Sequence, residues 1–590
     1  MRGSTLTAML LAGAVGLGAA QAPSPPPASS PAEWPSPGRD LQGTRFSPLR
    51  ELSPGNVAGL RVLWSFSTGS LRGHEASPLV IGDRLYLATP HPTAVYAFDL
   101  ERPGSPPVWR YQAAAGRDPA PALCCDVSTR GLAWHPSGRL LVPLFPGDLV
   151  ALSADSGKEL WRTRNGDPAA GLTMQGAPLV VGDLVIVGVG GGEFGGRGHL
   201  TAYDVSSGRR RWRAYSTGRD ADVLLGPTAN AAYPSHQTRD LGVATWTADS
   251  WLRGGGATDG WLTFDPVTGL LFHGTGAPAP LNYDQRRGDA KWTASLFARD
   301  AATGVARWAL QLTPGDRWGF GAGAESVPMD LDLGGREVRA LVHLDANGLA
   351  YSIDRLTGRI LLAEKYGPAN WASRVEASSG IPLPDPRYVP ATGRKVEEVC
   401  PSLLGMRTLQ PAAYSPLTGM VYVPANNLCM DLEPVAAAFE AGRPFVGANA
   451  RLVAGPGGMR GRFLAWDPGT ATIAWEIREP YPVLGGAMAT ATGLVFYGTL
   501  DGWLKAVDAQ NGRELWRFRA PSGILSTPIT FASADGRQYV AVVAGVGGAA
   551  ATAFASATAG STIARLGLPG AFGDLPAVTN PGGVLLVFGL

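Results

Sequence analysis

Hydrophobic and polar positions along the chain form short alternating stretches rather than long helical faces. One pattern recurs: an apolar strand runs into Ala-x-Asp, a turn that usually contains Gly follows, and Trp stands ten residues after the Ala. Alternation on both sides of a tight turn predicts a β-hairpin that ends on an aromatic side chain. The clearest copies are AYDVSSGRRRW at 202–212, ARDAATGVARW at 298–308, AWDPGTATIAW at 465–475 and AVDAQNGRELW at 506–516.

Four further stretches keep part of this pattern. ALSADSGKELW at 151–161 has Ser for Asp, AFDLERPGSPPVW at 97–109 has two extra turn residues, and SIDRLTGRILL at 352–362 ends in Leu. LRVLWSFSTG supplies a last end-piece at Trp64. Successive ends lie roughly 41 to 54 residues apart, apart from two intervals of about twice that length, which we expect to carry insertions.

This period fits a repeated sheet of four strands. One such sheet cannot bury both of its faces, so the repeats must stack on one another. Eight sheets in a ring close the structure without long exposed edges, whereas a linear β-solenoid, the alternative, has a much shorter period. The sequence therefore predicts an all-β fold, an eight-bladed β-propeller over residues 39–590.

The N-terminus has the features of an export signal. Arg2 is followed by an apolar stretch at 6–19 and by the small-x-small sequence Ala-Gln-Ala at 20–22. A membrane anchor is the alternative, but the apolar stretch is short and rich in Gly, and no basic stop signal follows it. We predict a signal peptide at 1–22, a Pro/Ser-rich linker at 23–38, no transmembrane domain, and export to the periplasm or cell envelope.

Charge and cysteine content narrow the class further. A net charge of +2 with scattered basic residues gives no indication of nucleic-acid binding. The chain has four cysteines, which in an oxidising compartment could form two disulfides. Cys124 and Cys125 are adjacent, however, and their Cα atoms, about 3.8 Å apart, lie below the usual disulfide range. Two reduced, buried cysteines are the alternative.

Several longer strings are more specific than the repeat. They are WPSPGRDLQGTRFSPL, STGSLRGHEASPLV, CCDVSTRGLAW, GVGGGEFGGRGHLTAYD, GTGAPAPLNYDQRRGDAKWT, VPANNLCMDLEP and FYGTLDGWLKAVDAQNGRELW. With the tryptophan-docking motif, these strings resemble the quinoprotein alcohol dehydrogenases of the methanol/ethanol type, which use pyrroloquinoline quinone (PQQ). The resemblance covers nearly the whole mature chain and implies oxidation of a small-molecule alcohol-type substrate. No Cys-x-x-Cys-His string for a built-in haem occurs, so electrons would pass to an external acceptor such as a c-type cytochrome.

The resemblance also implies roles for individual residues. Cys124 and Cys125 would close a strained disulfide ring against one face of the quinone, and Cys400 and Cys429 would form a second, ordinary bridge. The cofactor contacts would include Glu75, Arg130 and Asn426, with Glu193 as a ligand to Ca²⁺. Arginine suits such a contact because its fork binds a planar carboxylate through two parallel hydrogen bonds.

The glycine-rich string around Gly191 and Gly192 is not a phosphate loop. It lies between two predicted strands, so no helix N-terminus is available to present amides to an anion. We expect these glycines to let the backbone approach a flat ligand closely.

The sequence departs from the family at positions that the resemblance assigns to catalysis and to cofactor binding. The Asn that ligates Ca²⁺ is Ala277, the Asp taken as catalytic base is Gly319, and the acid of the lanthanide-using branch is Gly321. An Arg that touches the quinone is Ala346, the Trp that stacks beneath it is Asp259, and a Trp at the pocket mouth is Leu484. Loss of a general base typically costs 10²–10⁴ in rate. Asp259 and Asp316 are the candidates to compensate, as cofactor-site ligand or as base.

Two functions follow from this combination. The first is a divergent exported PQQ-dependent dehydrogenase, with Ca²⁺ held by an incomplete set of ligands. The second is a catalytically inactive propeller that serves as a binding or assembly scaffold. Retention of the paired cysteines, Glu75, Arg130, Glu193 and Asn426 favours the first, and the clustering of substitutions in the pocket favours the second. The sequence leaves turnover, substrate, metal, electron acceptor and oligomeric state open.

Overall fold

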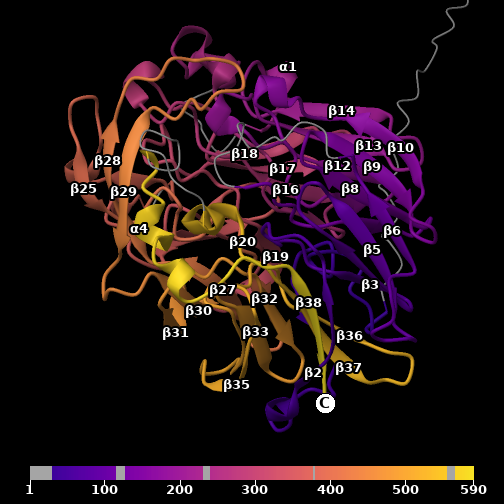
Figure 1. The fold of residues 1–590 in the computed structure, drawn as a ribbon. Coiled ribbons are helices and arrows are strands. Elements are labelled where there is room, and N and C mark those ends of the chain that lie inside the picture. The colour runs from indigo at the N-terminus through magenta and orange to yellow at the C-terminus, as the bar shows by residue number, and fades with distance from the viewer. Residues whose placement is uncertain (1–29, 115–125, 230–238, 377–378, 555–564) are drawn as a thin grey trace, which may run out of the picture.

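Strands dominate the described part of the chain (Figure 1). A computed structural model describes residues 30–114, 126–229, 239–376, 379–554 and 565–590. The predicted signal peptide and the adjacent Cys124 and Cys125 lie outside these residues. Within them the helices are short, and none combines the length and apolar character needed to cross a membrane.

The described residues form eight larger sheets, seven of four strands and one of five, and two smaller sheets of two and three strands. Neighbouring strands in these sheets pair antiparallel, except β1, which pairs parallel with β32. The first four sheets are β3 (Leu79–Ile81), β4 (Arg84–Ala88), β5 (Ala94–Asp99), β6 (Trp109–Gln112); β7 (Ala133–His135), β8 (Arg139–Leu144), β9 (Asp148–Ser153), β10 (Glu159–Arg164); β11 (Leu179–Val181), β12 (Leu184–Val187), β13 (His199–Asp204), β14 (Arg210–Tyr215); and β15 (Leu262–Asp265), β16 (Leu270–Gly274), β17 (Ser295–Asp300), β18 (Ala306–Gln311).

The remaining four sheets follow the same order along the chain. They are β19 (Ser326–Asp332), β20 (Glu337–Leu344), β21 (Leu349–Asp354), β22 (Ile360–Lys365); β26 (Ala413–Tyr414), β27 (Val421–Asn426), β30 (Gly461–Asp467), β31 (Thr472–Glu479); β1 (Phe46–Ser47), β32 (Ala487–Thr490), β33 (Leu494–Gly498), β34 (Trp503–Asp508), β35 (Glu514–Arg519); and β36 (Ile529–Ala532), β37 (Gln538–Ala544), β38 (Val584–Gly589), β2 (Arg61–Ser67).

The sheets are arranged as a ring. The first strands of neighbouring sheets contact one another: β7 contacts β11, β11 contacts β15, and β15 contacts β19. These first strands therefore form the inner edge of the ring. The N-terminal strand β2 pairs with the C-terminal strand β38, and Figure 1 shows the two side by side. This pairing brings an N-terminal and a C-terminal strand into one sheet and so closes the ring. The prediction of an all-β propeller is confirmed.

The two long intervals between repeats carry insertions, as the spacing predicts. The first, between β14 and β15, contains α1 (Asp220–Val223), α2 (Leu241–Ala244) and η6 (Ala248–Arg253). The second contains β23 (Ala372–Val375), β24 (Pro382–Pro384), η8 (Pro386–Tyr388), β25 (Val396–Val399), β28 (Leu428–Pro434) and β29 (Ala448–Ala454). A disulfide joins Cys400 to Cys429 in this second insertion, which confirms the bridge that the resemblance implied.

Short helical segments occupy other loops of the described chain. They are η1 (Val57–Gly59), η3 (Pro168–Ala170), η4 (Gly192–Phe194), η7 (Tyr283–Gln285), η9 (Gly548–Phe554), α4 (Pro569–Phe572) and η10 (Leu575–Ala577).

Five of the recurring tryptophans each contact the hairpin turn of the next sheet. The indole N–H of Trp161 donates to the carbonyl of Val205 at 2.9 Å, in the hairpin turn that follows β13. The ring lies against Gly208 of the same turn, where a Cβ would meet it at 2.7 Å. The same contact pairs Trp109 with Gly157, Trp212 with Gly304, Trp308 with Gly358 and Trp475 with Gly512. The Gly of the motif is thus required by the indole of the preceding sheet as well as by its own positive φ.

Replacing Gly208 by Ala should therefore destabilise the protein by about 1–3 kcal/mol. The added methyl group would overlap the ring of Trp161, and alanine is also strained at the φ of +68° that Gly208 adopts. Urea unfolding followed by tryptophan fluorescence measures this loss. Gly269→Ala is the matched control: its φ is +71°, but nothing lies within 4 Å of the added Cβ. Equal losses in the two variants would contradict a role for the indole contact.

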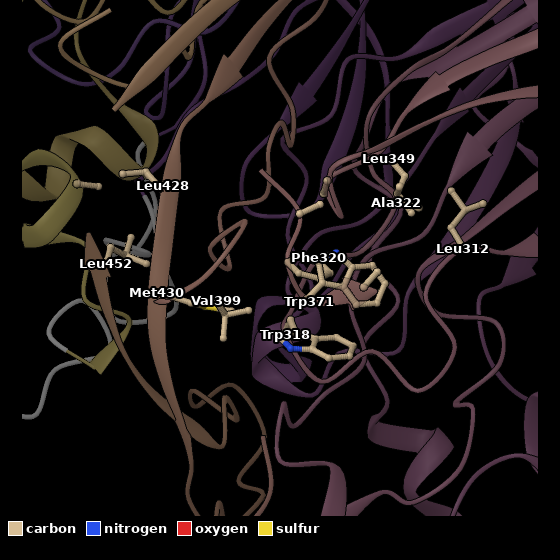
Figure 2. Packing of buried hydrophobic residues seen from close by; sticks show 14 of the residues in the cluster. Leu312, Trp318, Phe320, Ala322, Leu349, Trp371, Val399, Leu428, Met430 and Leu452 are labelled. Carbon is tan, nitrogen blue, oxygen red and sulfur yellow. The ribbon is translucent and has the colours of Figure 1, made fainter. Parts of the chain in front are cut away.

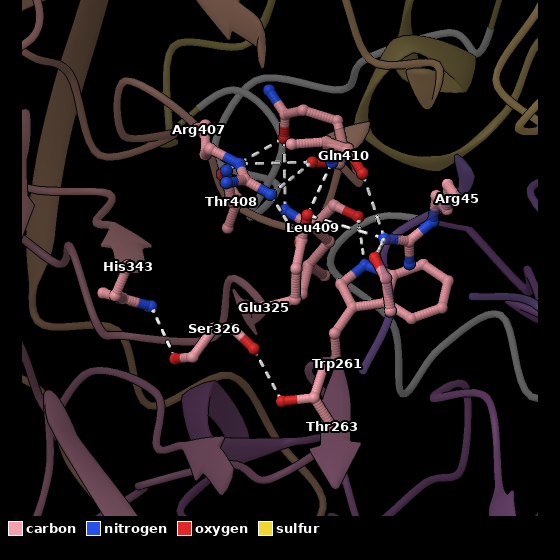
Figure 3. A network of polar contacts seen from close by, with 12 residues as sticks. Arg45, Trp261, Thr263, Glu325, Ser326, His343, Arg407, Thr408, Leu409 and Gln410 are labelled. Carbon is pink, nitrogen blue, oxygen red and sulfur yellow. Dashed lines mark hydrogen bonds and ion pairs between the residues drawn. The ribbon is translucent and has the colours of Figure 1, made fainter. Parts of the chain in front are cut away.

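A buried network of charged side chains joins inner segments of the ring (Figure 3). Glu325, which directly precedes β19, pairs with the Nη2 of Arg407 and lies 3.6 Å from the Nη1 of Arg45. Each of these side chains is 1% exposed. The guanidinium of Arg45 also lies 4.6 Å from the ring centroid of Trp261, whose indole donates to the carbonyl of Leu409.

Candidate active site

Four polar side chains occupy equivalent places in the loops that lead into the first strands of four sheets. Glu75 and Gln175 stand four residues before β3 and β11, and Arg130 and Asp259 stand three residues before β7 and β15. Because the first strands form the inner edge of the ring, these loops meet at one end of its axis. The structure thus brings together three residues that the sequence singled out and one that it did not.

Arg130 is the centre of this group. Its Nε lies 3.2 Å from the Oε2 of Glu75, and its Nη1 donates to the backbone carbonyl of Asp259 at 3.2 Å and to the Oδ2 of Asp259 at 3.4 Å. The Nη2 donates to the Oε1 of Gln175 at 3.4 Å. The Arg130 side chain is 8% exposed, and those of Glu75 and Asp259 are each 18% exposed. The site is therefore polar, largely enclosed and rich in carboxylates.

Glu193 adds a further carboxylate. It lies in η4, between β12 and β13, and its backbone carbonyl accepts the N–H of Phe445 at 2.7 Å. Burial, with a smaller contribution from the negative charge of Asp259, raises the pKa of Glu193 to about 7, although a backbone hydrogen bond opposes the rise. Burial also raises the pKa of Glu75, against the opposing effect of Arg130. A cation beside these carboxylates would relieve both penalties.

The predicted glycines are packed against protein backbone. Gly191 has a φ of +94°, and a Cβ there would lie 1.7 Å from the carbonyl oxygen of Gly171. A Cβ on Gly192 would lie 3.2 Å from the Cα of Gly255. These close approaches explain why the string contains glycine without reference to a ligand. Approach of a flat ligand to this string stays a prediction.

Asn426, predicted as a cofactor contact, makes its side-chain hydrogen bonds within the protein. At the end of β27 it is completely buried. Its Nδ2 donates to the carbonyls of Leu404 and Gly405 at 3.1 and 3.0 Å, and its Oδ1 accepts from the Nε2 of Gln410 at 3.2 Å. These contacts hold the loop that leads into β26. A direct contact of Asn426 with a cofactor stays a prediction.

The loop that carries Gly319 is held by Asp316. One carboxylate oxygen of Asp316 accepts the backbone N–H groups of Trp318 and Gly319, both at 2.9 Å, and the other accepts that of Gly321 at 3.1 Å. Burial raises the pKa of this completely buried carboxyl group, and the three amides oppose that rise. Both oxygens of the proposed alternative base are thus engaged in shaping the turn.

Arg286 ties the same loop to the neighbouring one. Its Nε and Nη2 donate to the backbone carbonyls of Pro280 and Asp316, respectively. The loop that contains Ala277 and the loop that contains Gly319 are therefore linked through one buried guanidinium. Nothing in the local sequence identifies this role of Arg286.

Apolar side chains surround the position of the missing base. A Cβ on Gly319 would lie 3.3 Å from both Cδ atoms of Leu281 and 3.7 Å from the Cβ of Leu403. Leu484 packs against the same hydrophobic cluster as these two leucines. Beneath the loop, Trp318 stacks on Phe320 with ring centroids 5.8 Å apart, and Trp371 packs beside both (Figure 2).

The position of the lanthanide-branch acid is closed to any side chain. Gly321 has a φ of +64°, and a Cβ there would lie 2.8 Å from the backbone nitrogen of Ala277. An acidic residue would require the two loops to move apart. Ala346, where the family has arginine, is likewise completely buried, and its backbone carbonyl accepts the N–H of Met406 at 2.8 Å.

Metal-ligand geometry is not preformed at this site. Within the described residues, one group of three acidic side chains brings its oxygens within 4.8 Å of one another: Asp83, Asp99 and Glu101. This group lies on the turns of the first sheet, where Arg84 and Arg102 pair with Asp99.

The sequence patterns missed Gln175. It lies in a string that contains no motif, but it has the same position before the first strand of its sheet as Glu75 has. Alignment of the repeats on their first strands, rather than on their tryptophans, is the signal that could have identified it.

Comparison with known proteins covers nearly the whole chain. Residues 34–375 and 465–540 match the family described as PQQ: glucose/ethanol/alcohol dehydrogenase, β-propeller domain. The lanthanide-dependent methanol dehydrogenase of Methylacidiphilum fumariolicum is 42% identical over 567 residues, which are 95% of this chain and 93% of that protein. Methanol dehydrogenase [cytochrome c] subunit 1 of Paracoccus denitrificans is 40% identical over 95% of this chain and 91% of its own length.

The fold comparison agrees with the sequence comparison. The structure of a europium-containing methanol dehydrogenase superposes with a TM-score of 0.92 at 42% identity, over 95% of this chain and 98% of that one. The sequence match and the fold match thus both cover 95% of this chain.

Proposed function

The chain belongs to the PQQ-dependent glucose/ethanol/alcohol dehydrogenase family, and from this premise we propose that it oxidises an alcohol-type substrate with an altered active site. The observation that carries the proposal is the ion pair between Arg130 and Glu75, two residues that by the resemblance would contact the cofactor. An enclosed arginine with nearby carboxylates is typical of a binding site rather than of a solvated surface.

The donor chemistry of this group fits the cofactor. Bound PQQ would supply the acceptor for the two electrons and the carbon-bound hydrogen that leave the alcohol as it becomes an aldehyde or ketone. Arg130 offers the positive charge that the carboxylates of such a cofactor require, and Glu193 offers a carboxylate to a cation. The hydroxyl proton of the alcohol needs a separate acceptor, which by the resemblance would stand where this chain has Gly319.

We infer from the apolar walls at Gly319 that proton removal is the weak step. Leu281 and Leu403 flank this position, and the carboxylate of Asp316 points into its own turn. The chain therefore orients and encloses a substrate there but offers it no carboxylate from this loop. Slow turnover is the expected consequence.

For the metal, we propose Ca²⁺. Gly321 excludes the additional acid of the lanthanide-using branch, so the site holds less negative charge than a trivalent ion favours. For the location, we propose from the predicted signal peptide the periplasm or cell envelope, where an external acceptor such as a c-type cytochrome would take the electrons.

The alternative function is a propeller that has lost turnover and serves as a scaffold. The observation that favours it is the ion pair between Asp259 and Arg130, because this pair occupies the guanidinium that an anionic cofactor would need. This alternative predicts no measurable affinity for PQQ.

Reconstitution distinguishes the two functions. We expect purified mature protein to bind PQQ in the presence of Ca²⁺, measured by calorimetry, and to reduce an artificial dye slowly with a primary alcohol. Parallel samples with La³⁺, and with EDTA and no metal, test the proposed ion. Arg130→Gln is the matched variant and should lose cofactor affinity, because an amide cannot replace the charged fork. Absence of binding by the unaltered protein would support the scaffold.

A further inference from the structure

We propose that Asp259 is an internal competitor of the cofactor: its carboxylate holds Arg130 in an ion pair that a carboxylate-bearing cofactor must open in order to bind. This inference rests on the proposed function, and it concerns a residue by which this chain differs from the family it belongs to.

The hydrogen-bonding capacity of Arg130 is the first argument. A guanidinium has five N–H donors, and it binds a carboxylate bidentately along either of two edges. The Nε of Arg130 faces Glu75, both contacts of its Nη1 go to Asp259, and its Nη2 donates to Gln175. Each edge that could receive an incoming carboxylate therefore already faces a protein carboxylate.

The position of Asp259 is the second argument. Its Oδ2 lies 2.8 Å from the place that a Cβ on Gly190 would take, so the side chain extends between Arg130 and the glycine string. The backbone carbonyl of Asp259 also accepts from the Nη1 of Arg130, at 3.2 Å. The carboxylate can thus leave Arg130 by a side-chain rotation while the loop keeps its backbone contact.

The charge balance is the third argument. The carboxylates of Glu75 and Asp259 share the guanidinium of Arg130, so an anionic cofactor meets two protein carboxylates that already face that positive charge. Like charges at such short range oppose binding strongly. Removal of the Asp259 charge both frees one edge of Arg130 and lowers this repulsion.

If Asp259 were instead a ligand to the metal, removing its charge would weaken cofactor binding rather than strengthen it. In that case its removal would weaken binding of the cofactor and cation together. Within the described residues, the oxygens of Asp259, Glu193 and Glu75 do not gather into a group of metal-ligand dimensions, which favours competition.

The test is the affinity of the full-length mature protein for PQQ, measured by quenching of intrinsic fluorescence with Ca²⁺ and, separately, with EDTA. We expect Asp259→Asn to lower the dissociation constant about tenfold or more under both conditions, and to reduce its dependence on salt. Asp183→Asn, the same substitution at a side chain that is 95% exposed, should leave the constant unchanged. Thermal melting of the PQQ-free proteins verifies that each variant folds, and Asp259→Ala provides a second removal of the charge.

Each other outcome overturns the proposal. An unchanged constant in Asp259→Asn would mean that the ion pair does not compete, and weaker binding confined to the Ca²⁺ samples would identify Asp259 as a metal ligand. In both cases the unaltered protein still binds PQQ, so the proposed function stands. If neither the unaltered protein nor the Asp259 variants bind PQQ, both the competition and the proposed function fail.

Discussion

Replacing Gly319 by Asp is expected to raise kcat of the reconstituted protein by about 10²–10⁴, the range that a positioned general base contributes. The substitution returns a carboxylate to the place where the family carries its catalytic aspartate. No other single change in the site is expected to alter the rate as much, because the remaining departures affect cofactor retention before they affect proton transfer.

The structure can accommodate this side chain. The φ of Gly319 is +85°, a region in which Asp is better tolerated than most residues. The nearest atoms to the added Cβ are the two Cδ atoms of Leu281, at 3.3 Å, and these can move by rotation of the leucine side chain. At Gly321, by contrast, a Cβ would meet the backbone of Ala277 at 2.8 Å, so an acid there has no comparable room.

Steady-state dye reduction as a function of substrate and pH measures the effect. Gly319→Asn is the matched control, since it has the same size and the same tolerance of positive φ but cannot accept a proton. An equal gain in both variants, or none in Gly319→Asp at equal PQQ content, would show that the missing base does not limit turnover.

Replacing Glu325 by Gln is expected to destabilise the fold by about 3–5 kcal/mol, the usual cost of leaving a buried charge without its partner. Arg45 and Arg407 would both lose their carboxylate, and neither can reach water, since each side chain is 1% exposed. The network joins the segment before β1, the inner strand β19 and the loop before β26, so its loss weakens three separate parts of the ring.

The effect should depend on pH in a defined direction. Burial raises the pKa of Glu325, but the charges of Arg407 and Arg45 and the backbone hydrogen bonds to its carboxylate together outweigh burial, so the folded-state pKa lies below its ordinary value. The contribution of Glu325 is therefore complete above the ordinary glutamate pKa and is lost as the pH falls through the lower folded value. The difference between the unaltered protein and Glu325→Gln should narrow over that acid range.

Urea unfolding at neutral and acid pH measures both effects. Glu397→Gln is the control, because the pair of Glu397 with Lys395 is exposed, and such pairs contribute about 1 kcal/mol or less. A loss no larger than that of the control would contradict the role assigned to the network.

Much of the fold could be read from the sequence. Ala-x-Asp, Gly and Trp predicted the hairpins, and the interval between repeats predicted the stacked sheets and the two insertions. These features were readable because each depends on neighbours within one hairpin or on one repeated contact, such as Trp161 on Gly208. The resemblance added the Cys400–Cys429 bridge, which no spacing alone specified.

For the candidate site, the sequence predicted which residues belong to it but not how they contact one another. Glu75, Arg130, Asp259 and Glu193 could be named, but not how their charges would be paired. Asp259 looked like a substitute ligand, whereas in the structure its carboxylate lies on Arg130, 129 residues away in the chain. Asp316 looked like a substitute base, whereas its oxygens bind the amides of its own turn.

The sequence by itself determined the repeated sheets, the indole contacts between them and the family, because these follow from local periodicity and from long matching strings. The tertiary structure alone decided which acceptors satisfy Arg130 and Asn426, and which glycines leave room for a side chain. The physical reason is that a buried charge or amide must be hydrogen-bonded, and the folded ring decides which partner lies within reach. For Arg130 the partners come from the loops of other sheets, and their distance along the chain carries no local signal.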